Sequence, residues 1–340
     1  MLPTFRHSKI LGIGAYLPPR VVTNDDMCTY MDTSDEWITK RSGIKERRWV
    51  ELDVTTSDMA MWAANDALEN AGVAKEEIDM IVLATNSPDH ENPATSCFLQ
   101  AKMGIKNIPC WDVRQGCCAF VFGLALADNF IRTHAANKVL LIGADLFSKS
   151  MEAWDHIREM AVLFADGAGA VVLGACDGEA AFEEPHVFST HLHTDGEGAR
   201  ELWCKAPGQC YPGPRISHEA IDRLEHLPQM NGSAVFLHAV QRMPEAVHEA
   251  LDFNGLKPDD IDLFIFHQAN LRINEMVTKV LGVPHERVHH TIQKFGNTTA
   301  ATIPLGLWDA VKAGKLKPGM LVGIAAFGSG FAWASSVIRW

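Results

Sequence analysis

The chain contains an internal repeat, and this repeat constrains the fold more than any other feature. The segment "DALENAGVAKEEIDMIVLATN" starts at Asp66, and "EALDFNGLKPDDIDLFIFHQAN" starts at Glu249. Aligning Ala67 with Ala250 fixes one constant offset between the two copies. At that offset further identical residues meet: Leu68 and Leu251, Gly72 and Gly255, Ile78 and Ile261, Asp79 and Asp262, and the pair Gly123–Leu124 with Gly306–Leu307. A helix, an acidic turn and a strand recur in order, which favours duplication of a half-domain.

Strand-like and helix-like runs alternate along the chain. The runs "MIVLATN" (80–86), "KVLLIGAD" (138–145) and "AVVLGAC" (170–176) predict buried strands, and 57–72 predicts a helix capped by Asp58 and ended by Gly72. This alternation predicts an α/β fold with helices covering a sheet. We expect two similar halves, 1–179 and 180–340. A Gly/Pro-rich excursion at about 180–232 should form a lid or a pocket wall.

Composition excludes several classes of protein. The 340 residues are 47% hydrophobic and 21% charged, as in globular proteins, and the net charge of −12 argues against non-specific nucleic-acid binding. The longest apolar run, 117–127, is too short to span a bilayer, and we recognise no signal peptide. Eight cysteines without a CxxC motif predict neither a disulfide framework nor a zinc site. We therefore expect a cytoplasmic protein with reduced thiols, no metal and no permanent cofactor.

Two adjacent cysteines, Cys117 and Cys118, stand where a long apolar helix should begin. The positive end of a helix dipole and its free N–H groups lower the pKa of a thiol. Neighbouring helical residues point about 100° apart, so both thiols cannot face one site. Taken alone, the pair is more simply interpreted as two inert core cysteines.

Three motifs in the second half could supply partners for a reactive thiol. His267 follows the apolar run "FIF", at the strand end where open α/β sheets place their ligand chemistry. Asn297 lies in a glycine-bounded turn before a helix, and 328–330 reads Gly-Ser-Gly after a strand. Singly, each motif has an ordinary structural interpretation as a core histidine, a helix cap or a turn.

Together, the motifs resemble the β-ketoacyl-acyl-carrier-protein synthase III family of the thiolase-like superfamily. The resemblance is carried by "TSDEWITKRSGIKER" (33–47), the Cys117 helix, "FADGAGAVVL" (164–173), "HQANLRI" (267–273), "FGNTTAATIP" (295–304) and "FGSGFAWASSVIRW" (327–340). It implies a thiolase-like fold in which two duplicated βα halves form α-β-α-β-α layers. It also implies an acyltransferase active in fatty-acid biosynthesis.

The resemblance implies a decarboxylative Claisen condensation of an acyl-CoA with a malonyl thioester carried by carrier protein or by CoA. Cys117 would be the nucleophile, and the backbone amides of Cys117 and Ser329 would hold the oxyanion. His267 and Asn297 would donate hydrogen bonds to the malonyl thioester carbonyl, His267 through Nε2.

Binding residues follow from the same resemblance. It implies CoA contacts at Trp37, Arg41, Arg158, Thr33 and Asn270, carrier-protein contacts at Arg272 and Lys279, and acyl-pocket positions at Asn92 and Cys118. It also implies a homodimer whose acyl pocket is partly lined by the neighbouring subunit.

Departures from the family pattern leave the substrates open. "GCCAF" makes the helix start bulkier, and Leu237 and Val280 stand where lysines are common. Members that make quinolones, pyrones or acetoacetyl-CoA are alternatives, as is acyl transfer to a hydroxyl or amine without decarboxylation. An inactive partner subunit would lack Cys117 or His267, and a true thiolase would carry a second cysteine in the terminal glycine loop.

Overall fold

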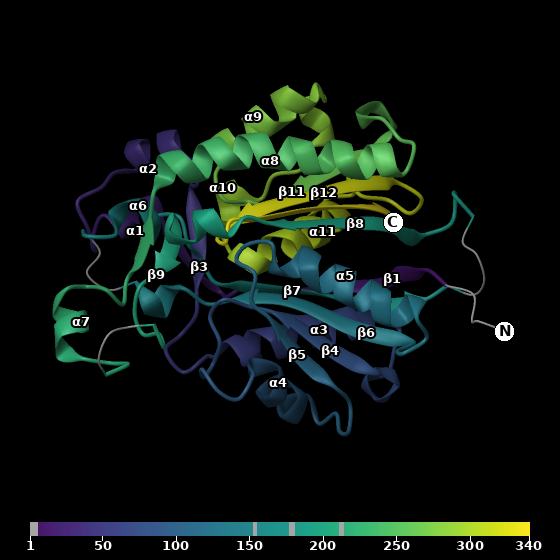
Figure 1. Cartoon of the computed structure of the whole chain (residues 1–340), viewed down its shortest axis with the longest axis horizontal. Coiled ribbons are helices and arrows are strands. Elements are labelled where there is room, and N and C mark those ends of the chain that lie inside the picture. Colours follow the sequence, from purple (N-terminus) through teal and green to yellow (C-terminus); the bar gives the residue numbers. More distant parts are fainter. Residues whose placement is uncertain (1–5, 152–154, 177–180, 211–213) are drawn as a thin grey trace.

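The chain folds into five layers, in which helices and sheets alternate (Figure 1). The computed structural model describes residues 6–151, 155–176, 181–210 and 214–340. Two sheets lie one above the other, with helices between them and helices on both outer faces. This is the layered α-β-α-β-α architecture that the resemblance implies.

The first sheet has five strands in the order β1-β7-β6-β4-β5. Its central strands β4 (Met80–Ala84) and β6 (Lys138–Asp145) are parallel, and β5 (Cys110–Val113) extends them at one edge. The strands β7 (Gly167–Ala175) and β1 (Ser8–Tyr16) follow on the other side in antiparallel pairing. The inner strands are buried along their length, as their continuous apolar runs predict.

The second sheet repeats this topology in the order β11-β12-β13-β8. The parallel pair is β11 (Leu263–Phe266) and β12 (Leu321–Gly328), and the antiparallel strands are β13 (Ala332–Arg339) and β8 (His186–Thr194). A single parallel bridge from Phe264 to Val288 takes the place of the outer strand. Strand β8 lies inside the segment expected to be an irregular excursion. That part of the expectation is wrong.

The internal repeat corresponds to equivalent elements. Strands β6 and β12 have the same length, and both their first and their last residues match at the offset of the sequence repeat. Helices α3 (Thr56–Ala71) and α8 (Gly232–Phe253) are followed by Gly72 and Gly255, whose φ angles of 62° and 66° are left-handed. The proposed boundary between the halves, 179/180, lies outside the described residues. Strand β7 before it belongs to the first sheet and β8 after it to the second.

The outer helices bury an apolar face against their sheets. Helices α3 and α4 (Thr95–Met103) cover the first sheet, and α8 and α9 (Leu271–Leu281) cover the second (Figure 1). Thr55, not Asp58, is the N-cap of α3. The Thr55 side chain accepts from the Asp58 N–H, and the Asp58 carboxylate accepts from the Thr55 N–H. The prediction of Asp58 as the cap was wrong because this reciprocal pair places it three residues inside the helix.

The central layer consists of α5 (Ala119–Arg132) and α11 (Thr302–Lys312), which share one buried apolar cluster with both sheets. The segment that leads into α11 lies very close to the first sheet. A Cβ atom on Gly143 of β6 would lie 2.4 Å from the carbonyl oxygen of Ala300. Ala300 belongs to the short helix η6 (Thr299–Ala301), which leads into α11.

The remaining elements gather at one end of the layers (Figure 1). They are β2 (Arg20–Thr23), α1 (Asn24–Met27), α2 (Asp35–Ser42), β3 (Glu46–Trp49), α6 (Arg158–Ala161), β9 (Leu202–Cys204), α7 (His218–Asp222), β10 (Pro228–Met230) and α10 (Ile292–Phe295). Among the described residues, no helix combines the length and apolar character needed to cross a membrane.

We predict that Gly143→Ala lowers the free energy of unfolding by about 3 kcal/mol, because the added methyl group meets a backbone carbonyl that cannot rotate away. Urea unfolding measures the change. Gly196→Ala is the matched control, since its methyl group would enter open space. Equal stability of the two variants would contradict the close approach of η6 to β6.

Candidate active site

A cavity of about 500 Å³ opens between the two halves and brings together most of the predicted site residues. Cys117 from the first half and His267 and Asn297 from the second half line it. Trp37, Arg41, Asn270 and Arg272 also line the cavity, together with apolar residues that include Leu163, Phe164, Leu202, Val235, Phe236, Met243 and Phe327. Arg158, Thr33, Ser329, Cys118, Asn92 and Lys279 are not among the lining residues described.

Cys117 lies in the turn that precedes α5 and is only 9% exposed. Burial raises the pKa of its thiol to about 12, and the negative charge of Asp145 acts in the same direction. The prediction of a lowered pKa was wrong, because removal from water outweighs the favourable helix terminus. Cys117 therefore rests as a neutral thiol.

Cys118 points away from this cavity. Its side chain is fully buried in the apolar cluster between the sheets, and its Sγ donates to the carbonyl of Ala332 at 3.2 Å. The two adjacent cysteines thus have different surroundings, although both lie before the first residue of α5, Ala119.

The loop between β12 and β13 packs tightly against the turn that carries Cys117. A Cβ atom on Gly328 would lie 2.6 Å from the backbone nitrogen of Cys117, and one on Gly116 would lie 2.9 Å from the backbone nitrogen of Ser329. Only glycine permits these approaches. They bring the backbone segments of Cys117 and Ser329 side by side.

His267 follows β11, and its ring is 2% exposed. Its backbone N–H donates to Ala325 of β12 at 2.8 Å, which fixes the residue at the end of the parallel strands. Nδ1 lies 2.7 Å from Oγ1 of Thr302, while Nε2 has no partner among the described residues. Burial lowers the pKa of His267 to about 3, so the imidazole is neutral.

Asn297 is held by its backbone on both sides. Its N–H donates to Leu163 at 2.9 Å, and its carbonyl accepts from Ala165 at 3.0 Å. The side-chain oxygen accepts from the N–H of Thr299 at 2.9 Å. This bond assigns the amide orientation and leaves Nδ2 as a donor.

Asp145, at the end of β6, connects the loops that carry these residues, and its side chain is fully buried. Its carboxylate accepts hydrogen bonds from Thr85, Asn86 and Ser87 after β4, and from Thr299 and Ala300 in η6. Asn86 in turn donates to the carbonyl of Gly116. Sequence reasoning missed Asp145, although an aspartate that ends the apolar run "KVLLIGA" is a usable signal.

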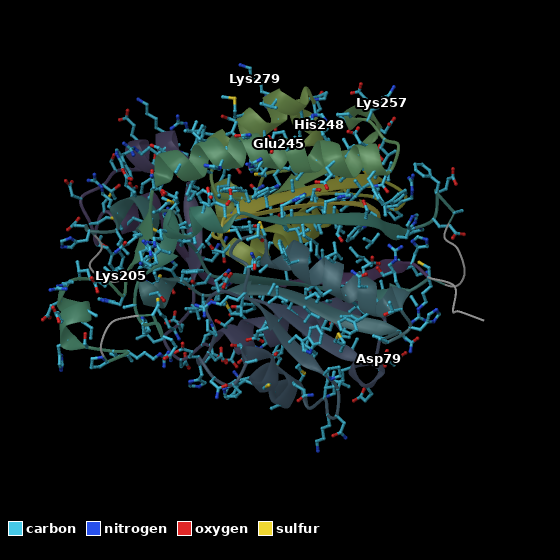
Figure 2. The ribbon with its side chains drawn as sticks, viewed as in Figure 1. Asp79, Lys205, Glu245, His248, Lys257 and Lys279 are labelled. Carbon is cyan, nitrogen blue, oxygen red and sulfur yellow. The ribbon has the colours of Figure 1, made fainter. Side chains whose placement is uncertain are left out.

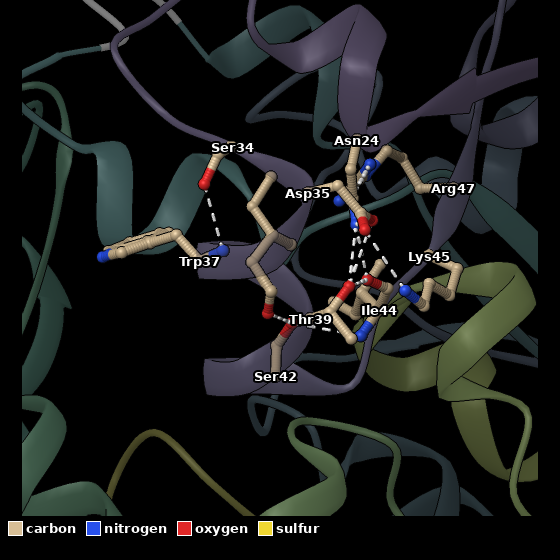
Figure 3. A network of polar contacts seen from close by, with 10 residues as sticks. Asn24, Ser34, Asp35, Trp37, Thr39, Ser42, Ile44, Lys45 and Arg47 are labelled. Carbon is tan, nitrogen blue, oxygen red and sulfur yellow. Dashed lines mark hydrogen bonds and ion pairs between the residues drawn. The ribbon is translucent and has the colours of Figure 1, made fainter.

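Trp37 projects from α2, whose start is capped by Ser34 (Figure 3). A partly buried network anchors the same helix, in which Asn24 donates to Asp35 at 2.8 Å and accepts from Arg47 at 2.8 Å. The Trp37 indole is therefore presented from a rigid support.

Two guanidinium groups lie over the Trp37 ring, those of Arg41 at 4.7 Å and Arg158 at 4.9 Å from its centroid. Arg41 is paired with Glu159, and Arg158 donates to the carbonyl of Asp32.

The other predicted contacts lie around this region or at the surface. Asn270 caps α9 and donates to the carbonyl of Arg41 at 2.9 Å. The Thr33 hydroxyl is buried without a hydrogen-bond partner among the described residues. Lys279 projects outward from α9 (Figure 2), and Asn92 is exposed. No group of three potential metal ligands is found within the described ranges.

Two α/β halves of one topology, meeting over a buried Cys–His–Asn cavity, define a thiolase-like enzyme. Two family models match the chain. "3-Oxoacyl-[acyl-carrier-protein (ACP)] synthase III" matches residues 111–196, and the model of its C-terminal region matches residues 251–340.

Similar proteins can be aligned with this chain over nearly its whole length. The β-ketoacyl-[acyl-carrier-protein] synthase III of Methylococcus capsulatus is 42% identical over 335 residues, covering 98% of this chain and 99% of the relative. That of Rhodospirillum centenum is 45% identical over 333 residues, with the same coverage. The solved 3-oxoacyl-[acyl-carrier-protein] synthase III from Aquifex aeolicus superposes with a TM-score of 0.88 at 38% identity, covering 98% of this chain and all of the other. This chain belongs to the β-ketoacyl-[acyl-carrier-protein] synthase III family of condensing acyltransferases.

We predict that Asp145→Asn lowers the free energy of unfolding by about 3 kcal/mol, because the amide presents donors to donors inside a buried site. Urea unfolding measures this change, and the exposed Asp252→Asn is the control. Removing the charge should also lower the Cys117 pKa, so alkylation by iodoacetamide should rise with pH earlier than in the wild type. Unchanged stability would show that the carboxylate does not hold the loops together.

Proposed function

We propose that this chain condenses an acyl-CoA with a malonyl thioester to give a 3-oxoacyl product. The observation that carries the proposal is the meeting of Cys117, His267 and Asn297 in one buried cavity. Such a cavity supplies one soft nucleophile and neutral hydrogen-bond donors, which suit thioester chemistry.

In the first half-reaction, the Cys117 sulfur attacks the acyl-CoA carbonyl. A new bond joins Sγ to the acyl carbon, the bond to the CoA sulfur breaks, and the Cys117 proton ends on CoA. The backbone amides of Cys117 and Ser329 stabilise the tetrahedral oxyanion, and the close packing at Gly116 and Gly328 supports this assignment.

In the second half-reaction, the malonyl thioester loses CO₂ and leaves an enolate. Asn297 and His267 donate hydrogen bonds to its oxygen from Nδ2 and Nε2. The α-carbon then attacks the acyl group, and Cys117 leaves as a thiolate that takes a proton from solvent. The free Nε2 of His267 and the fixed amide of Asn297 support these roles.

CoA would bind with its adenine against Trp37 and its phosphates near Arg41 and Arg158. The guanidinium groups over the indole support a site for an aromatic, anionic ligand. Thr33 and Asn270 would complete this region, and no permanently bound cofactor takes part in the proposal.

A carrier protein would contact Arg272 and Lys279, two exposed residues of α9. Arg272 also lines the cavity, so a thioester docked there can reach Cys117. Leu237 and Val280 are exposed nearby on α8 and α9, which makes this face less basic than the family pattern implies. Malonyl-CoA therefore stays an alternative acceptor.

A homodimer would form through the edge of the first sheet. In the described part of the chain, strand β5 pairs with β4 alone, and its Trp111 is 40% exposed. Asp112 of β5 also accepts from the N–H groups of Thr95 and Ser96, which holds the segment after Asn92 beside this edge. A partner at β5 would thus meet Asn92, which we propose as an acyl-pocket residue of the dimer.

Cys118 does not line the cavity, and we propose that it affects the acyl pocket only indirectly, through its hydrogen bond to the carbonyl of Ala332. None of the eight cysteines forms a disulfide in the described residues, and we propose a reducing, cytoplasmic compartment. The halves 1–179 and 180–340 are proposed as the two structural units.

Intact-protein mass spectrometry after exposure to a panel of acyl-CoAs tests the nucleophile. We expect the wild type and Cys118→Ala to gain one acyl group, and Cys117→Ala to gain none. Subsequent malonyl-CoA or malonyl-carrier protein should discharge the label and identify the acceptor. A label that persists on Cys117→Ala would refute the assignment.

We predict that Asn297→Ala slows malonyl decarboxylation by about a hundredfold, because one donor to the enolate is lost. Acylation of Cys117 should stay within a few-fold of the wild type, since Asn297 has no part in it. Release of CO₂ and acyl labelling measure the two steps separately. An equal loss in both would contradict the proposed division of roles.

A further inference from the structure

The ring of His267 is held between the cavity and one buried hydroxyl group. Its Nδ1 lies 2.7 Å from Oγ1 of Thr302, which is 1% exposed. His267 lines the cavity, and its buried Nε2 has no hydrogen-bond partner among the described residues. A neutral imidazole carries one proton, so the bond at Nδ1 decides whether Nε2 is a donor or an acceptor.

Thr302 has one hydroxyl proton and two acceptors within reach. Oγ1 lies 2.9 Å from the carbonyl oxygen of Thr299 and 2.7 Å from Nδ1 of His267. The Thr299 carbonyl already accepts the backbone N–H of Thr302. No other donor to Nδ1 is found in the described part of the chain. Because the proposed condensation needs the imidazole proton on Nε2, Nδ1 must accept a hydrogen bond, and the Thr302 hydroxyl is the group within reach that can donate it. The Thr299 carbonyl then keeps the bond from the Thr302 N–H.

We propose that Thr302 is a positioning residue that donates to Nδ1 of His267 and so fixes the tautomer that carries its proton on Nε2. This inference rests on the proposed condensation, in which Nε2 must donate to the malonyl thioester oxygen. It adds the reason why a neutral histidine presents a proton there.

Only the half-reaction that includes decarboxylation requires a proton on Nε2 of His267. During decarboxylation the C–C bond to the carboxylate breaks, CO₂ leaves, and the electron pair moves onto the thioester to form the enolate. An Nε2–H group stabilises that oxygen, whereas an Nε2 lone pair would repel it. Acylation of Cys117 uses backbone amides instead, so it does not depend on the tautomer.

The segment around η6 determines both the orientation of the Asn297 amide and the tautomer of His267. Thr299 lies between the two donors, because its N–H fixes the Asn297 side chain and its carbonyl faces Thr302. The Thr299 hydroxyl is bound by Asp145. Both donors to the enolate are thus set by the same three-residue turn.

Thr302→Val removes the hydroxyl while nearly keeping the shape of the side chain. We expect malonyl-CoA decarboxylation to fall about tenfold to a hundredfold, below the loss from removing a complete oxyanion donor. Acylation of Cys117 should stay near the wild-type rate, and Thr302→Ser should restore decarboxylation. Thr278→Val is the matched control. Thr278 is buried in α9, and its hydroxyl donates to the Asn274 carbonyl at 2.6 Å rather than to a histidine.

¹⁵N-histidine NMR reads the tautomer directly, with the His267 signals assigned by their loss in His267→Gln. The wild type should show a protonated Nε2, and Thr302→Val should shift toward a protonated Nδ1. A protonated Nδ1 in the wild type would overturn the inference, even if Thr302→Val failed to fold. So would normal decarboxylation by Thr302→Val, or an equal loss of acylation and decarboxylation. Absence of any acylation in the wild type would instead refute the proposed function, while the spectrum decides the tautomer separately.

Discussion

A fully buried carboxylate, that of Asp145, joins the two halves of the chain beside Cys117. No cation pairs with it among the described residues, so hydrogen-bond donors must replace the water that it loses on folding. Those donors come from the end of β4 and from η6. Each bond to a charged acceptor contributes about 1.5–3 kcal/mol. Neither loop can move without leaving a buried charge unsatisfied, so the position of Asn297 is coupled to that of Cys117.

The same burial sets the protonation states of the site. Removal from water raises the pKa of Cys117 to about 12 and lowers that of His267 to about 3. Both groups are therefore neutral before substrate binds. A neutral thiol is protected from adventitious reaction, and a neutral imidazole donates a hydrogen bond without releasing its proton to an enolate. The site stabilises charge only where the reaction generates it.

The sequence predicted the regular core well and its buried details poorly. The run 138–145 coincides with β6, and the run 80–86 contains β4, because continuous apolar runs bounded by turns have few alternatives. Strand β8 was missed, since histidine, serine and threonine interrupt its apolar positions and its pairing with β13 is not visible locally. The direction of the Cys117 pKa shift was also missed, because it depends on depth of burial, which packing alone decides. Asp145 and Thr302 belong to the same category: each acts through partners that are distant in sequence.

The duplicated topology places different residues at equivalent positions of the two halves. At the offset that aligns Ala67 with Ala250, Asp145 corresponds to Gly328, and Cys117 corresponds to Ala300. Each strand end meets the helix start of the opposite half. Asp145 accepts from the N–H of Ala300, whereas Gly328 packs against the N–H of Cys117.

At the end of β6, the carboxylate of Asp145 accepts the N–H of Ala300, so this junction is occupied by a bond between the two halves. Gly328, at the end of β12, has no side chain that could accept from the amide of Cys117, which leaves this amide for the oxyanion role proposed above. The fold thus repeats one junction twice, and the residue at the strand end decides whether a side chain of the same chain occupies the facing amide.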